Sequence, residues 1–153
     1  MVALIILTMI WVPISGVREH VCTWYGNEFL GRKPSAAWHG VADVVVDEVT
    51  YGIAAPIEIP LGSYVRVCRT GTCSDSTRLL STDYNGRCVV ARVLDRRARS
   101  IPGYWDLWPA TAEALGFGPS WAHRGLDAGC IQATVEIRRI GRIQWDLIST
   151  FTK

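Results

Sequence analysis

The stretch VLDRRARSIPGYWDLWPATAEALG, residues 93–116, is the most informative part of the chain. It starts in an apolar run typical of a strand, passes through a polar turn and reaches a second strand-like stretch, YWDLW. Asp95 and Asp106 lie at the ends of these two runs. A helix is expected next, because Pro109 suits a first helical position, ATAEAL is rich in helix formers, and Gly116 suits the position after the last turn. The stretch therefore predicts two strands, each ending on an acid, and one short helix.

More strands are expected on both sides of this stretch. SYVRVCR (63–69) and CVVARVLD (88–95) alternate or run apolar with β-branched residues, and the segment between them ends on the turn signal Asn85-Gly86. A last strand is expected in CIQATVEIRRI (130–140). Several short strands, one short helix and long connections are typical of a small β-barrel. With 153 residues, the chain has room for one domain with a real core but not for two.

The N-terminal segment MVALIILTMIWVPISGV, residues 1–17, has no charged side chain and is apolar until it meets a proline and small residues. This pattern is typical of a signal peptide cleaved after Gly16, although no basic residue precedes the apolar run. An uncleaved anchor, which would associate the chain with a membrane, and a buried N-terminal strand or helix are the alternatives. We therefore predict a signal peptide or membrane anchor at 1–17, a barrel domain at 18–140, and a C-terminal tail or added strand at 141–153.

Five cysteines also favour export, since small extracellular barrels use disulfides to supplement a limited core. Cys68 and Cys88 lie at facing ends of two expected strands and are predicted to form one bridge. Cys22 and Cys130 open the first and last strands and are predicted to form a second, which leaves Cys73 free. Metal binding through CRTGTC is the alternative, but no second pair of Cys or His follows at ligand spacing, so we predict no metal site.

The charge pattern gives no reason to expect nucleic acid as a partner. Sixteen basic residues against fourteen acidic ones leave a formal charge of +2, without a long run of either sign. No nucleotide, haem or flavin motif is present in the sequence, so no cofactor is expected. We expect a monomer.

Five motifs occur in the order seen in rare lipoprotein A-like domains. In chain order they are CTWYGNEFLGRK (22–33), GIAAPIEIPLGSYVRV (52–67), VVARVLDR (89–96), WDLWPATAEALG (105–116) and GCIQATVEI (129–137). Residues 22–140 thus resemble these domains, which are double-psi β-barrels related to expansins and barwin-like endoglucanases. The resemblance implies a mainly β fold: a six-stranded double-psi β-barrel with one short helix.

The same resemblance implies an exported protein, whether secreted, periplasmic or attached to the cell envelope, that works on peptidoglycan or a related polysaccharide. Some rare lipoprotein A proteins resemble lytic transglycosylases, which cut glycan strands stripped of their peptides. Expansins instead bind and loosen wall polymers without clear hydrolysis. Our first hypothesis is a peptidoglycan lytic transglycosylase-like enzyme, and the second is a non-catalytic expansin-like polysaccharide-binding or wall-loosening module. A protein-binding barrel, such as an inhibitor, is a third.

Two aspartates are the first candidates for catalysis. Asp95 matches the aspartate of the family's NDRGP motif, and Asp106 matches that of its DLS motif, the acid most closely tied to activity in expansins and the related endoglucanases. A carboxylic acid can protonate the oxygen of a glycosidic bond; two acids suit hydrolysis, and one suffices where the sugar's own hydroxyl attacks. Structural roles are the alternative: arginines that follow Asp95 offer it ion pairs, and Asp106 lies where it would cap the helix.

The segment GRKPSAAWHGVADVVVDEVTYG, residues 31–52, departs from the family pattern. It replaces a Thr-Ala-Asn-Gly-Glu motif whose glutamate is a candidate catalytic group, and Asp43, Asp47 and Glu48 are the only local substitutes. ADVVVDEVTYG alternates like a strand, so these acids are either auxiliary catalytic groups or solvated charges at strand ends. The family's DRGP has also become DRRA, and the histidine of its TAAH has become Pro56.

Seven Trp and five Tyr are many for this length. Flat rings stack on the apolar faces of sugars, while aromatic side chains on strands more often pack in a core. Trp24 and Trp105 are expected in the core. The candidate substrate-binding residues are Tyr25, Trp38, Tyr104 and Trp108.

Overall fold

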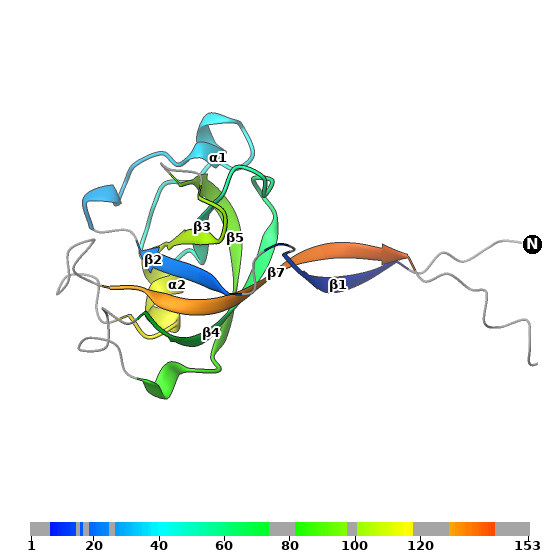
Figure 1. Cartoon of the computed structure of the whole chain (residues 1–153). Coiled ribbons are helices and arrows are strands. Elements are labelled where there is room, and N and C mark those ends of the chain that lie inside the picture. The colour runs from blue at the N-terminus through cyan, green and yellow to red at the C-terminus, as the bar shows by residue number, and fades with distance from the viewer. Residues whose placement is uncertain are drawn as a thin grey trace, which may run out of the picture.

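The computed structural model describes residues 7–14, 16, 19–24, 27–73, 82–97, 101–117 and 129–142, and its backbone is mainly β (Figure 1). The strands are β1 (Leu7–Pro13), β2 (His20–Trp24), β3 (Gly52–Ala55), β4 (Tyr64–Thr72), β5 (Cys88–Arg96), β6 (Tyr104–Leu107) and β7 (Ile131–Arg142). Two short helices, α1 (Ser35–Trp38) and α2 (Pro109–Ala114), and 3₁₀ turns at Asn27–Phe29 and Thr82–Tyr84 connect them.

Six of the strands close into a mixed barrel. Their hydrogen-bonded order is β7-β2-β6-β3-β5-β4, and β4 pairs in turn with β7, which closes the circle. The β2–β6 and β3–β5 pairs are parallel, and the other four pairs of the barrel are antiparallel. The predicted mainly β fold and six-stranded barrel are confirmed.

Strand β7 is longer than the barrel. Its first part pairs with β2 and β4, and residues 136–142 pair antiparallel with β1. Together, β1 and the second part of β7 form a two-stranded arm that projects from the barrel (Figure 1). Removal of residues 1–17 as a signal peptide stays a prediction. Within the described ranges, no helix has the length and apolar character needed to cross a membrane.

Helix α2 lies where the sequence predicts it. Pro109 takes its first position, and Gly116 follows its last turn with a φ of 88°, a conformation that favours glycine. A Cβ atom at this position would also collide with the ring of Tyr84. Helix α1 was not predicted, because it is only four residues long and follows Pro34 in a segment without helical periodicity.

Two hydrophobic clusters lie on opposite faces of the barrel wall. The first takes alternate residues from all six barrel strands and fills the interior; it includes Trp24 and Trp105, as predicted. The second lies outside the barrel, because its strand residues alternate with interior ones. Its members are Ala36, Val46, Ala54, Leu94 and Trp108. The segment that carries α1 thus packs over the outer face of β3 and β5.

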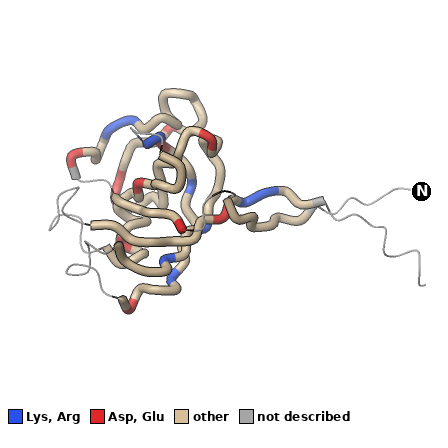
Figure 2. The backbone as a smooth tube through the Cα atoms, in the orientation of Figure 1, with Lys and Arg blue, Asp and Glu red and all other residues tan. Residues whose placement is uncertain are grey.

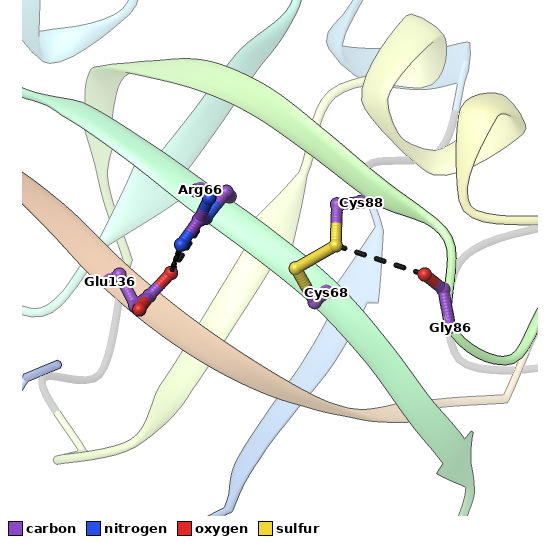
Figure 3. Close-up of a disulfide and its surroundings, with 5 residues drawn as sticks. All are labelled: Arg66, Cys68, Gly86, Cys88 and Glu136. Atoms are coloured by element: carbon purple, nitrogen blue, oxygen red, sulfur yellow. Dashed lines mark hydrogen bonds and ion pairs between the residues drawn. A yellow bond between two sulfur atoms is a disulfide. The ribbon is translucent and has the colours of Figure 1, made fainter. Parts of the chain in front are cut away.

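One disulfide is the predicted one. Cys68 of β4 and Cys88 of β5 are directly paired in the sheet, with Cα atoms 4.0 Å apart, and their sulfurs are bonded (Figure 3). The second disulfide joins Cys73 to Cys130, while Cys22 is a free, buried thiol. The predicted Cys22–Cys130 bridge and the free Cys73 are therefore wrong.

The pleat of the sheet explains this correction. Cys22 pairs with Ile131, and both side chains point into the barrel interior. Cys130 precedes Ile131 by one residue and therefore faces away from Cys22.

Since both cysteines of CRTGTC are in disulfides, neither is available as a metal ligand. The two disulfides indicate an oxidising, extracytoplasmic environment.

A buried histidine links β2 to β6. The Nδ1 atom of His20 accepts a hydrogen bond of 3.0 Å from Nε1 of Trp105, and the His20 side chain is almost completely buried. Burial lowers the pKa of His20 below its ordinary value of 6.5. Protonation at Nδ1 would turn the acceptor into a donor and break the bond to Trp105.

Acidification is therefore expected to destabilise the fold through His20. Between the lowered pKa and 6.5, the unfolded chain binds a proton that the folded chain does not. The free energy of unfolding should therefore fall as the pH drops below 6.5, by at most about 1.4 kcal/mol per pH unit. Urea unfolding between about pH 5 and 7.5, above the range of most carboxylates, measures the slope. His20→Gln should lose this slope and His39→Gln, on an exposed loop, should keep it; equal slopes in both variants would contradict the assignment.

Candidate functional site

The sheet register places four side chains in one row across four strands. Thr23 of β2 pairs with Asp106 of β6, Asp106 pairs with Ala54 of β3, and Ala54 pairs with Asp95 of β5. We call these four residues the aspartate row. Directly paired residues lie on the same face of the sheet, and the residues on either side of Asp106 in β6 point into the barrel. The aspartate row therefore lies on the outer face. Two strand spacings separate the aspartates, so their Cα atoms lie about 10 Å apart.

The middle of the aspartate row is covered. Ala54 is fully buried in the outer cluster, beneath the segment that carries α1. Packed side chains, and not open space, therefore lie over the residue that separates Asp95 from Asp106. The long segment at 31–52 covers the barrel wall at this point.

Asp95 holds helix α1 against β5. Its Oδ1 accepts hydrogen bonds from the Ser35 backbone nitrogen at 2.8 Å, from Ser35 Oγ at 2.6 Å and from the Arg96 backbone nitrogen at 2.8 Å. Ser35 is the first residue of α1, so these bonds satisfy a donor that the helix itself leaves open. The geometry therefore gives Asp95 a structural role.

Asp106 lies in a group of polar and aromatic side chains, which we call the Asp106 cluster: Thr23, Arg97, Tyr104 and Asp106. The Thr23 hydroxyl donates to Oδ1 of Asp106, and Nε of Arg97 lies 3.1 Å from Oδ2 in an ion pair. The Arg97 guanidinium also lies 5.0 Å from the centre of the Tyr104 ring. The Asp106 side chain is 20% exposed and Tyr104 is 38% exposed, so the cluster is in contact with solvent.

Cys22 lies under this cluster on the interior side of the barrel wall. Burial, with a smaller contribution from the negative charge of Asp106, raises the pKa of its thiol far above the ordinary range. The thiol is therefore protonated near neutral pH and is not a nucleophile.

The three acids of segment 41–51, Asp43, Asp47 and Glu48, do not belong to the aspartate row. Both oxygens of Asp47 are used in a tight turn: they accept from the Val49 nitrogen at 2.9 Å, the Thr50 nitrogen at 2.6 Å and the Thr50 hydroxyl at 2.8 Å. Partial burial raises the pKa of Asp47, but these hydrogen bonds outweigh it, so the net shift is downward. Glu48 and Asp43 are exposed. The expected strand does not form here, because the Asp47 turn interrupts it before β3 begins at Gly52.

The aromatic candidates have different environments. Trp38 ends α1 and is 75% exposed, with its Nε1 donating to the Lys33 carbonyl at 3.2 Å. Trp108 is fully buried, and Gly52 packs so closely on its indole that a Cβ atom would collide with it. Trp108 therefore fills the outer cluster and presents no ring face to a sugar, in contrast to its predicted role in substrate binding. Tyr25 lies outside the described residues.

Two members of the Asp106 cluster were missed from the sequence. Arg97 follows Asp95 by two residues, and no sequence signal indicated that it pairs with Asp106. Thr23 carries no motif, and the only signal was its outward position between Cys22 and Trp24, which are both buried.

The part of the chain that the structure describes contains no group of three or more His, Cys, Asp or Glu side chains able to hold a metal ion. No protein-family model matches the chain, and the curated proteins contain no match to it.

Proposed function

We propose that the protein is an exported, double-psi β-barrel domain that acts on cell-wall glycan through the Asp106 cluster. The observation that carries the proposal is the grouping of a carboxylate, a hydroxyl, a guanidinium and a partly exposed phenol ring on one outer face of the barrel. Polar groups of this kind hydrogen-bond sugar hydroxyls, and an aromatic ring stacks on the apolar face of a sugar. The five motifs and the two disulfides support a site of action that is secreted, periplasmic or at the cell envelope.

The arrangement of the acids favours lytic transglycosylase-like cleavage over hydrolysis. Hydrolysis requires two carboxyl groups flanking the bond, whereas Asp95 anchors α1 and Ala54, which lies between the two aspartates, is covered. One carboxyl group suffices when the sugar's own hydroxyl is the nucleophile. We propose Asp106 for this role.

The proposed step uses one proton in a closed cycle. The Asp106 carboxyl gives its proton to the glycosidic oxygen as the bond from that oxygen to C1 breaks. The C6 hydroxyl of the same sugar forms a new bond to C1, and its proton returns to the Asp106 carboxylate. The product is an anhydro-ended glycan, and no water is consumed.

An expansin-like binding module is the second candidate, and one observation favours it. Both oxygens of Asp106 already accept hydrogen bonds inside the protein, from Thr23 and from Arg97. A carboxylate held in this way is arranged as an acceptor, and it must release one of these partners before it can donate a proton.

Mass spectrometry of the soluble products distinguishes the two candidates. The purified full chain is incubated with intact peptidoglycan and with peptidoglycan stripped of its peptides. We expect anhydro-ended fragments from the stripped polymer. Sedimentation of the protein with the polymer in the absence of fragments would leave only the binding function, and neither fragments nor sedimentation would overturn the proposal as a whole.

A further inference from the structure

A second row of side chains crosses the outer face on other strands. Arg92 of β5 is paired with Tyr64 of β4, and Trp11 of β1 is paired with Arg138 of β7. The Tyr64 ring joins the two pairs, because its centre lies 5.9 Å from the Arg92 guanidinium and 5.8 Å from that of Arg138. We call these four residues the arginine–aromatic row. It spans β5, β4, β7 and β1, whereas the Asp106 cluster lies on β2, on β6 and just after β5. If residues 1–17 are removed on export, the row consists of Tyr64, Arg92 and Arg138.

The row carries positive charge that the described residues do not neutralise. The neighbouring Arg66 is neutralised by Glu136, with Nε of Arg66 2.6 Å from Oε2 (Figure 3). In the described part of the chain, neither Arg92 nor Arg138 makes an ion pair, and Nε of Arg92 is buried without a hydrogen-bond partner. Basic residues colour the β7 strand of the arm, while residues 7–13 of β1 carry no charge (Figure 2).

The rings of the row are placed for contact with a ligand. Tyr64 is 43% exposed, Arg138 is exposed, and Trp11 is partly exposed beside it. The guanidinium of Arg66 lies 5.3 Å from the centre of the Trp11 ring. Guanidinium groups bind carboxylates through paired hydrogen bonds, and partly exposed aromatic rings contact the apolar parts of sugars. Alternating cations and rings along one row therefore suit a polymer that carries both sugar rings and acidic groups.

We propose that the arginine–aromatic row binds an acidic polysaccharide, namely the peptide-stripped glycan strand of peptidoglycan. Removal of the peptides leaves a free carboxylate on every second sugar, which matches the unneutralised arginines in charge. The two disulfides favour this polymer over nucleic acid, because they indicate an extracytoplasmic environment. The choice of polymer rests on the proposed function, but binding at this row does not depend on cleavage at Asp106.

The test compares two charge-matched double variants of the full chain. Arg92→Gln/Arg138→Gln removes both unneutralised cations of the row. Arg87→Gln/Arg139→Gln removes the same charge elsewhere: Arg139 follows Arg138 on β7 and faces the opposite side of the arm, and Arg87 lies on the Tyr84 ring at 4.2 Å. Urea unfolding confirms that both variants keep the wild-type fold.

Binding is measured against stripped peptidoglycan and against chitin, a neutral polymer with related sugar rings. Loss of two charge contacts, each worth up to about fivefold in affinity, should make Arg92→Gln/Arg138→Gln bind the stripped glycan about tenfold more weakly. The control variant should stay within about twofold of wild type, and binding to chitin should be weak and equal in all three proteins.

Three results would overturn the inference: equal weakening by the control variant, binding to chitin as tight as to the acidic glycan, or binding to single-stranded DNA that competes fully with the glycan. The outcome is separable from the cleavage assay. A wild-type chain that binds through the row but releases no fragments would refute cleavage and support the row. If Arg92→Gln/Arg138→Gln binds the stripped glycan like wild type, binding at the row is refuted, whatever the cleavage assay gives.

Discussion

Replacement of Asp106 by Asn is expected to slow glycan cleavage by about 10²- to 10⁴-fold, the usual contribution of a general acid. Asn has the same shape, and its carbonyl oxygen can still accept a hydrogen bond from Thr23 or Arg97, so the cluster should keep its structure. The amide cannot release a proton to the glycosidic oxygen. Binding to the polymer should therefore change little while product formation falls. The rate of release of anhydro-ended fragments, measured by mass spectrometry, checks this.

Asp95→Asn is the matched control for this prediction. It removes the same charge from the second aspartate of the row, whose carboxylate anchors Ser35 at the start of α1. We expect cleavage within about tenfold of wild type but a loss of about 1–2 kcal/mol in the free energy of unfolding, because charge-assisted hydrogen bonds are weakened. Abolition of cleavage by Asp95→Asn, with Asp106→Asn still active, would reverse the assignment of the acid.

Removal of the Cys73–Cys130 disulfide is expected to have the largest effect on stability. The bridge joins residues 57 apart in sequence, whereas Cys68–Cys88 joins residues 20 apart. The entropy of the closed loop predicts losses of about 4 kcal/mol for Cys73→Ser/Cys130→Ser and about 3 kcal/mol for Cys68→Ser/Cys88→Ser. Denaturant unfolding without reductant measures both, and intact mass confirms which bridges have formed.

Cys22→Ala separates loss of a bridge from loss of a buried sulfur. Cys22 is buried and free, so Cys22→Ala should lower the free energy of unfolding by only about 1 kcal/mol, through the loss of buried apolar contacts around the sulfur. A Cys22→Ala protein that lacks one disulfide by mass and loses as much stability as Cys73→Ser/Cys130→Ser would show that the bridges are paired differently.

The candidate site was harder to predict than the fold. Asp95 and Asp106 were found from their motifs, and the register does place them in one row. Their partners were not found, because the pairing of Arg97 with Asp106 on β6 depends on the tertiary structure. The buried position of Trp108 was also missed, since a tryptophan next to a helix start has no local signal that separates core from surface.

Local patterns were sufficient for the features that depend on neighbours in the chain. Alternation of apolar residues indicated the strands and the core positions of Trp24 and Trp105, and Pro109 with Gly116 indicated α2. Cys68 and Cys88 were paired correctly because a single hairpin carries both. In each case the relevant physics acts over a few residues or across one turn.

The cross-strand relationships came from the folded chain alone. The Cys73–Cys130 bridge, the hold of Asp95 on α1 and the two side-chain rows all join residues that are far apart in sequence. They depend on which strands are neighbours and on register, where a shift of one residue turns every side chain to the other face. Closure of the six-stranded barrel fixes that register, because each strand must satisfy two neighbours at once, and no local pattern contains this constraint.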